Sequence, residues 1–307
     1  MKKILIISPP RSGSSVLSQL LETAGFSYPA SPSPVVSKVS ISPSEFNPSG
    51  YNEDTLFTLL NDQLIRILYG NQYSFLHSPS IADIEKSFAE DLKPYKFKSF
   101  CYDLDEKSVI IPDSYPSRLH ELANHSWDVW GLTRMGPLGK WYQAYSKHNV
   151  SNGEDIYDTY CKYLSFLSND SSSTHFYLKD PRLIFAAPAY VPTLKKSGFS
   201  IIIINRSTTD LLSSMRGHYG NRLFTDNCID NLGFVSNHFN YRIKPQEFSD
   251  YIDSVEFSIN MLKASGIPFL SISYDNLMDH KTRSFELVSL NNFIGAEVDP
   301  SILRDPN

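Results

Sequence analysis

Four short apolar runs stand out against an otherwise mixed chain, at residues 3–8, 175–178, 200–205 and 268–273. Two of them consist largely of isoleucine and leucine without an intervening polar residue. Continuous β-branched runs of this length are typical of strands that are buried on both faces of a parallel sheet. The pattern therefore predicts four such strands.

Helical spacing of apolar residues follows two of the four runs. Residues 16–25 place Val16, Leu17, Leu20 and Leu21 on one face of a helix that ends at Gly25. Leu211, Leu212 and Met215 repeat the arrangement after the run at 200–205. Strands interleaved with helices predict an α/β protein, a three-layer sandwich with a central parallel sheet.

The middle of the chain has a different pattern. Residues 31–49 are rich in Ser and Pro, which predicts a surface loop or flap, and whether it closes as a lid stays open. Residues 56–68 have the spacing of an amphipathic helix. Residues 71–174 contain few strand-like runs and are interpreted as a mostly helical insertion that caps the sheet on its acceptor side. We expect 1–307 to form a single domain.

Charge and cysteine content exclude several classes of function. The formal charge of −5 argues against a duplex nucleic-acid partner, which requires a surplus of Lys and Arg. The three cysteines are far apart and show no C-x-x-C spacing, so we expect neither a zinc site nor a redox-active cysteine pair. The same pattern indicates a protein of a reducing compartment. No apolar run is long enough to span a membrane. We therefore expect a cytoplasmic protein without a bound metal or an integral membrane segment.

A loop of small residues joins the first predicted strand to its helix. Such a loop exposes backbone N–H groups at the positive end of the helix dipole, which favours an anion. Arg11 adds a fixed positive charge, and Ser12, Ser14 and Ser15 add hydroxyl donors around Gly13. The loop is not the triphosphate-binding Gly-x-x-x-x-Gly-Lys-Ser/Thr, because Ser14 holds the Lys position. A tight turn with a capping serine is the alternative interpretation.

A second polar pair follows the run at 200–205. Arg206 stands at the carboxyl end of this predicted strand, where open parallel sheets bind ligands, and Ser214 lies in the helix that follows. The two side chains would converge on a second phosphate. The alternative is a solvent-exposed arginine and a serine on a helix surface.

These segments resemble the sulfotransferases that use 3′-phosphoadenosine 5′-phosphosulfate (PAPS). The stretch Pro10-Arg11-Ser12-Gly13-Ser14-Ser15 is similar to the loop that binds the 5′-phosphosulfate in that family. Arg206, Asp210 and Ser214 match its second motif, which binds the 3′-phosphate.

Four further stretches are similar to patterns of the same family: 47–53, 179–182, 273–277 and 293–295. The resemblance leaves residues 71–174 uncovered. It implies a P-loop-like sulfotransferase fold and transfer of a sulfuryl group from PAPS to a hydroxyl of a carbohydrate, lipid or small metabolite. The product nucleotide would be 3′-phosphoadenosine 5′-phosphate, and no metal would be needed.

The resemblance also implies roles for individual residues. Arg11, with the loop N–H groups, would stabilise the departing 5′-phosphate, while Arg206 and Ser214 anchor the 3′-phosphate. Glu53 is the first choice for the general base, and an acidic residue in the first turn of a helix is the alternative. Lys179 is the second choice, as base or as a cation that assists the leaving group, and it stands where cytosolic animal members place a catalytic His. The alternative is that Lys179 is a structural partner of Asp180.

Two other functions fit parts of the pattern. A nucleotide kinase or NTPase would use the same strand, loop and helix but would require magnesium and the missing loop lysine. A catalytically inactive sulfotransferase-like module would bind a nucleotide or a partner without turnover. The oligomeric state is not indicated by the sequence.

Overall fold

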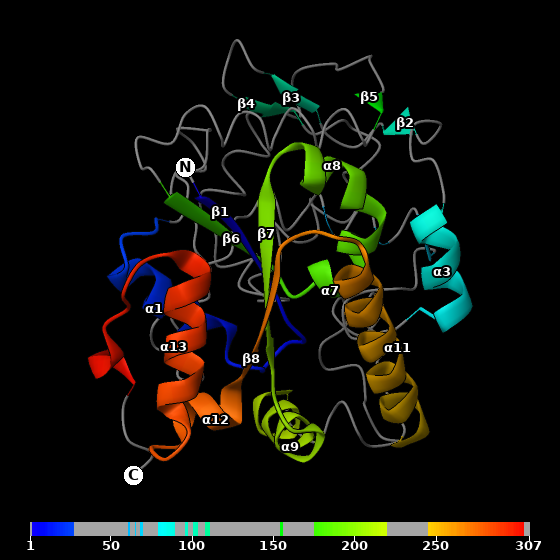
Figure 1. Cartoon of the computed structure of the whole chain (residues 1–307). Coiled ribbons are helices and arrows are strands. Elements are labelled where there is room, and N and C mark those ends of the chain that lie inside the picture. The colour runs from blue at the N-terminus through cyan, green and yellow to red at the C-terminus, as the bar shows by residue number, and fades with distance from the viewer. Residues whose placement is uncertain are drawn as a thin grey trace.

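The computed structural model has a central sheet of parallel strands in the order β6-β1-β7-β8 (Figure 1). The strands are β1 (Lys2–Ile7), β6 (His175–Lys179), β7 (Phe199–Asn205) and β8 (Phe269–Ser273). They coincide with the four apolar runs, so the strand prediction and the α/β class are confirmed. The structure describes residues 2–27, 61, 65, 68–69, 79–89, 96–97, 101–103, 108–110, 154–155, 175–219 and 245–303.

The strand order places a topological switch point beside β1. Leu5 of β1 lies opposite Leu178 of β6 on one side and Ile201 of β7 on the other. The chain therefore moves from β1 to one neighbour and then crosses to the other. Open parallel sheets bind ligands outside the carboxyl ends of the strands at such a point.

Helices cover both faces of this sheet (Figure 1). On one side lie α1 (Ser14–Thr23), α12 (Tyr274–Met278) and α13 (Arg283–Ile294). The opposite side carries α3 (Ile81–Ala89), α7 (Leu183–Ala186), the 3-10 helix η1 (Ala187–Tyr190), α8 (Val191–Lys196) and α11 (Pro245–Ala264). Helix α9 (Thr208–Tyr219) follows β7, and a 3-10 turn, η3 (Pro300–Ile302), comes after α13. The described elements thus form three layers, as the alternating pattern predicted.

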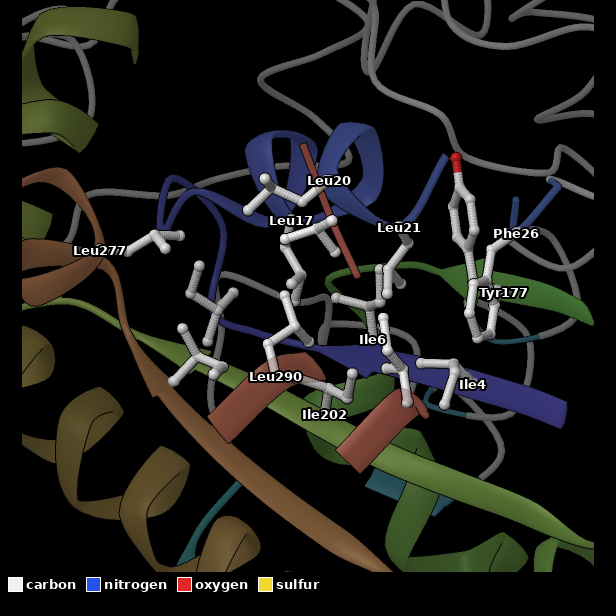
Figure 2. Packing of buried hydrophobic residues seen from close by; sticks show 14 of the residues in the cluster. Ile4, Ile6, Leu17, Leu20, Leu21, Phe26, Tyr177, Ile202, Leu277 and Leu290 are labelled. Carbon is white, nitrogen blue, oxygen red and sulfur yellow. The ribbon is translucent and has the colours of Figure 1, made fainter. Parts of the chain in front are cut away.

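The core between α1 and the sheet explains the leucine spacing (Figure 2). Leu17, Leu20 and Leu21 of α1 belong to the same buried cluster as Ile4 and Ile6 of β1. All five side chains are fully buried. Each such side chain contributes roughly 1.5–3 kcal/mol through the removal of apolar surface from water.

The opposite face of β1 is equally apolar. Leu5 and Ile7 alternate with the residues that face α1, and both are fully buried. Leu194 of α8 is buried on the side of the sheet where α8 contacts β7. Because helices cover both faces of the sheet, neither face of β1 meets water, and the strand must be apolar at successive positions.

The range 71–174 is described only in part. It holds α3 and two antiparallel pairs, β2 (Lys96–Phe97) with β5 (Glu154–Asp155) and β3 (Cys101–Asp103) with β4 (Ser108–Ile110). The remainder of this predicted insertion, and the predicted flap at 31–49, lie outside the described residues. Of the predicted helix at 56–68, residues 61, 65 and 68 are described, and they are helical. Among the helices that are described, none has the length and apolar character to cross a membrane.

Candidate functional site

Polar and charged side chains gather where the strands of the sheet end. Arg11 follows β1, Lys179 is the last residue of β6, Arg206 follows β7 and Tyr274 follows β8. Because the strands are parallel and in register, their carboxyl ends meet at one edge of the sheet. This edge holds most of the residues that the sequence singled out.

Gly13 shapes the loop between β1 and α1. Its φ of 91° lies in the left-handed region, where a side chain is strained. A Cβ atom built at this position would lie 2.0 Å from Cδ2 of Tyr274. The loop therefore needs glycine here for two reasons, its backbone conformation and the close approach of an aromatic ring. Arg11 also adopts a positive φ, 70°.

The N-terminus of α1 has polar groups suited to an anion. The Gly13 carbonyl accepts the N–H groups of Val16 and Leu17, and no side chain caps the helix. The Ser12 hydroxyl is fully buried and has no hydrogen-bond partner among the described residues. An unsatisfied buried hydroxyl costs about 1–3 kcal/mol, so a bound acceptor would be stabilised here.

Lys179 brings a buried positive charge to the same helix end. Only 2% of its surface is exposed, and its Nζ donates to Oγ of Ser15 over 3.0 Å. β6 lies beside β1, which is why the last residue of β6 reaches the first turn of α1. The Lys179 ammonium group therefore adds positive charge beside the N-terminus of α1, where the helix dipole also favours an anion.

Arg206 and Arg11 are in direct contact. Nη1 of Arg206 donates to the main-chain carbonyl of Arg11 over 3.2 Å, and Nε of Arg11 lies 3.4 Å from Oγ of Ser214. Nε of Arg206 is buried and has no hydrogen-bond partner within the described part of the chain. The structure thus brings both predicted phosphate-binding arginines, and the predicted serine, to one place.

The turn after β8 supports Arg206, a feature that we did not predict. The Arg206 guanidinium lies 4.8 Å from the centre of the Tyr274 ring, and the carboxylate of Asp275 accepts the N–H of Ser207 over 2.7 Å. The only sequence signal for these two residues was their place after an apolar strand, in a stretch similar to the carboxy-terminal family pattern.

Asp210 lies in the first turn of α9, which Ser207 caps. The Ser207 oxygen accepts the Asp210 N–H over 3.3 Å, and the Ser207 hydroxyl donates to the Asp210 carboxylate over 2.7 Å. Asp210 is exposed. Its match to the second family motif therefore has a local structural explanation.

Asp180 and Arg182, adjacent to Lys179, form a buried ion pair. Arg182 donates to Oδ1 of Asp180 from Nη1 over 3.0 Å and from its main-chain N–H over 2.9 Å. The other carboxylate oxygen accepts the Asn61 amide over 3.0 Å. Burial raises the pKa of Asp180, while the Arg182 guanidinium and these hydrogen bonds oppose that rise. The Asp180–Arg182 pair lies directly after β6 and anchors its end.

Most of the predicted site residues lie at the carboxyl edge of the sheet. They are Arg11, Ser12, Gly13, Ser14, Ser15, Lys179, Arg206 and Ser214. Glu53, the first choice for the general base, lies outside the described residues. Within the described ranges, no group of three or more His, Cys, Asp or Glu side chains is arranged to hold a metal ion.

The arrangement is suited to a ligand with more than one negative charge. Arg11, Lys179 and Arg206 carry positive charge on three neighbouring strand ends, and the N-terminus of α1 adds backbone donors. Comparison of the sequence with models of known protein families and with curated proteins finds no match.

Proposed function

We propose that the protein is a sulfotransferase of P-loop-like fold that moves a sulfuryl group from PAPS to the hydroxyl of a carbohydrate, lipid or small metabolite. The observation that supports the proposal is the contact between Arg206 and Arg11, because the two segments that we expect to bind anions meet there although the two arginines are 195 residues apart. A nucleotide with phosphates at both its 5′ and 3′ positions matches two such segments better than a nucleotide with one.

The residues around α1 would bind the 5′ end of the donor. Arg11, the Ser12 and Ser15 hydroxyls and the first N–H groups of α1 would neutralise charge that accumulates on the phosphate as it leaves. Lys179 would add a cation on the same side, since its Nζ already contacts Ser15. Arg206 and Ser214 would hold the 3′-phosphate, and both lie within hydrogen-bonding reach of Arg11.

The transfer itself would be an in-line displacement. The acceptor oxygen forms a bond to sulfur while the bond between sulfur and the bridging phosphate oxygen breaks, and 3′-phosphoadenosine 5′-phosphate leaves. A general base takes the acceptor proton; Glu53 is the first choice and Lys179 the second. A positioned base typically contributes about 10²–10⁴-fold to the rate.

Calorimetry with 3′,5′-adenosine bisphosphate and with 5′-AMP tests the binding part of the proposal. The bisphosphate should bind about 10- to 100-fold more tightly, the factor that a hydrogen-bonded charge pair contributes. Arg206→Ala should erase this preference and leave 5′-AMP affinity nearly unchanged. Lys281→Ala removes one positive charge at an exposed position and should preserve the preference. Equal affinities for the two nucleotides in the wild-type protein would contradict the proposal.

Turnover separates the enzyme from the alternatives. Labelled PAPS incubated with pools of carbohydrate, lipid and small-molecule hydroxyls should yield a labelled product without added magnesium. Magnesium-dependent ATP hydrolysis in place of sulfuryl transfer would indicate the NTPase alternative, and tight nucleotide binding without any product would indicate an inactive module.

A further inference from the structure

We propose that Tyr274 and Asp275, at the turn between β8 and α12, form a clamp that positions Arg206 for its ligand. The importance of Arg206 rests on the proposed function, whereas the clamp itself is a property of the unliganded protein. Neither residue is assigned to bind the donor here. Both would act through Arg206.

The first half of the clamp is the Tyr274 ring. The Arg206 guanidinium lies 4.8 Å from the ring centre, within the range of a cation–π contact. The same ring packs on the main chain of Gly13, where a Cβ atom would lie 2.0 Å from Cδ2. One ring therefore contacts both the loop after β1 and the arginine after β7.

The second half is the Asp275 carboxylate. It accepts the N–H of Ser207, the residue directly after Arg206, over 2.7 Å. This bond fixes the main chain at the start of α9, and the Ser207 and Asp210 side chains complete the same turn. Adjacent residues of one turn thus hold the side chain of Arg206 and the backbone of its neighbour.

The clamp would matter because an arginine side chain loses considerable rotamer freedom when it binds a ligand. Arg206 is held by the Tyr274 ring and by one hydrogen bond to the Arg11 carbonyl. Its buried Nε lacks a hydrogen-bond partner among the described residues. A guanidinium that is already held in position, and that still has an available N–H donor at Nε, can bind an anion without the entropy cost of ordering the side chain.

Selectivity between nucleotides distinguishes positioning from a general structural role. Tyr274→Leu should reduce the preference for 3′,5′-adenosine bisphosphate over 5′-AMP by about 3- to 30-fold, as expected for a cation–π contact, while 5′-AMP affinity stays within about twofold. Tyr274→Phe keeps the ring and should retain the preference. The clamp would be overturned if Tyr274→Leu left the preference unchanged or lowered the affinity for both nucleotides equally. It would also be overturned if Tyr274→Phe lost the preference as Tyr274→Leu does.

A measurement without nucleotide keeps this test separate from the proposed function. In NMR spectra of the wild-type protein, the side-chain protons of Arg206 should show an upfield ring-current shift and its Nε–H should exchange slowly. Both signatures should persist in Tyr274→Phe and disappear in Tyr274→Leu. If the wild type does not distinguish the two nucleotides but the signatures are present, the proposed function fails and the clamp stands. If the wild-type signatures are absent, the clamp fails whatever the nucleotide data show, and this outcome needs no variant to fold.

Discussion

Arg206 donates a hydrogen bond to the carbonyl of Arg11 across a separation of 195 residues. The contact exists because β1 and β7 are neighbours in the sheet and end at the same edge. Each arginine therefore constrains the surroundings of the other. A substitution at the end of one of these strands should have a measurable effect at the end of the other.

Gly13→Ala should destabilise the protein and weaken nucleotide binding. The left-handed backbone at this position costs a residue with a side chain about 1–2 kcal/mol, and the clash with Tyr274 adds to that cost. Chemical denaturation and calorimetry would measure both effects. Gly25→Ala is the matched control, since φ is 82° there and no atom lies within 4 Å of the added Cβ. A Gly13 variant no less stable than the Gly25 variant would contradict the close packing of Tyr274.

Lys179→Met should preserve the fold and weaken the binding of 3′,5′-adenosine bisphosphate and 5′-AMP by similar factors. Methionine fills a comparable volume, and the lost charge lies beside the first turn of α1, where both nucleotides would place the 5′-phosphate. Calorimetry with both nucleotides provides the test. A loss confined to the bisphosphate would instead place Lys179 near the 3′-phosphate.

Glu53→Gln should lower the turnover of sulfuryl transfer by about 10²- to 10⁴-fold and leave nucleotide affinity nearly unchanged, because it removes a base but not a donor contact. Rates under saturating PAPS, together with the calorimetric affinity, separate the two effects. A normal rate in this variant would transfer the role to Lys179 or to another residue.

Ser207→Ala should lower the free energy of unfolding by about 1 kcal/mol and also reduce the nucleotide preference that depends on Arg206. Ser80→Ala is the control, because Ser80 caps α3 with Asp83 in the same way as Ser207 caps α9 with Asp210. Urea unfolding should show similar losses of stability for the two variants. Only Ser207→Ala should alter the ratio of the two nucleotide affinities; a change in both variants, or in neither, would contradict a specific link between this cap and Arg206.

Asp180→Ala should cost about 3–5 kcal/mol of stability, since it leaves the Arg182 guanidinium buried without its carboxylate. The double variant Asp180→Ala/Arg182→Met should recover much of that loss. Denaturation midpoints of the two proteins provide the measurement. A single variant as stable as the wild type would show that the pair contributes little to the end of β6.

The sequence alone indicated the four strands, the α/β class and the helices that follow β1 and β7. Those features depend on local periodicity, because a strand covered on both faces must be apolar at every position, as Ile4 to Ile7 are. It also indicated the two arginines, since each follows a predicted strand.

Which strand ends are neighbours becomes evident only in the folded chain. Strand order depends on pairings between segments far apart in the chain, and no local pattern records that β7 lies beside β1. The same reason explains why Tyr274 and Asp275 were missed as support for Arg206 and why Lys179 has Ser15 as a partner. Such contacts arise from close packing in three dimensions, where a ring, a glycine and a guanidinium from three different turns meet.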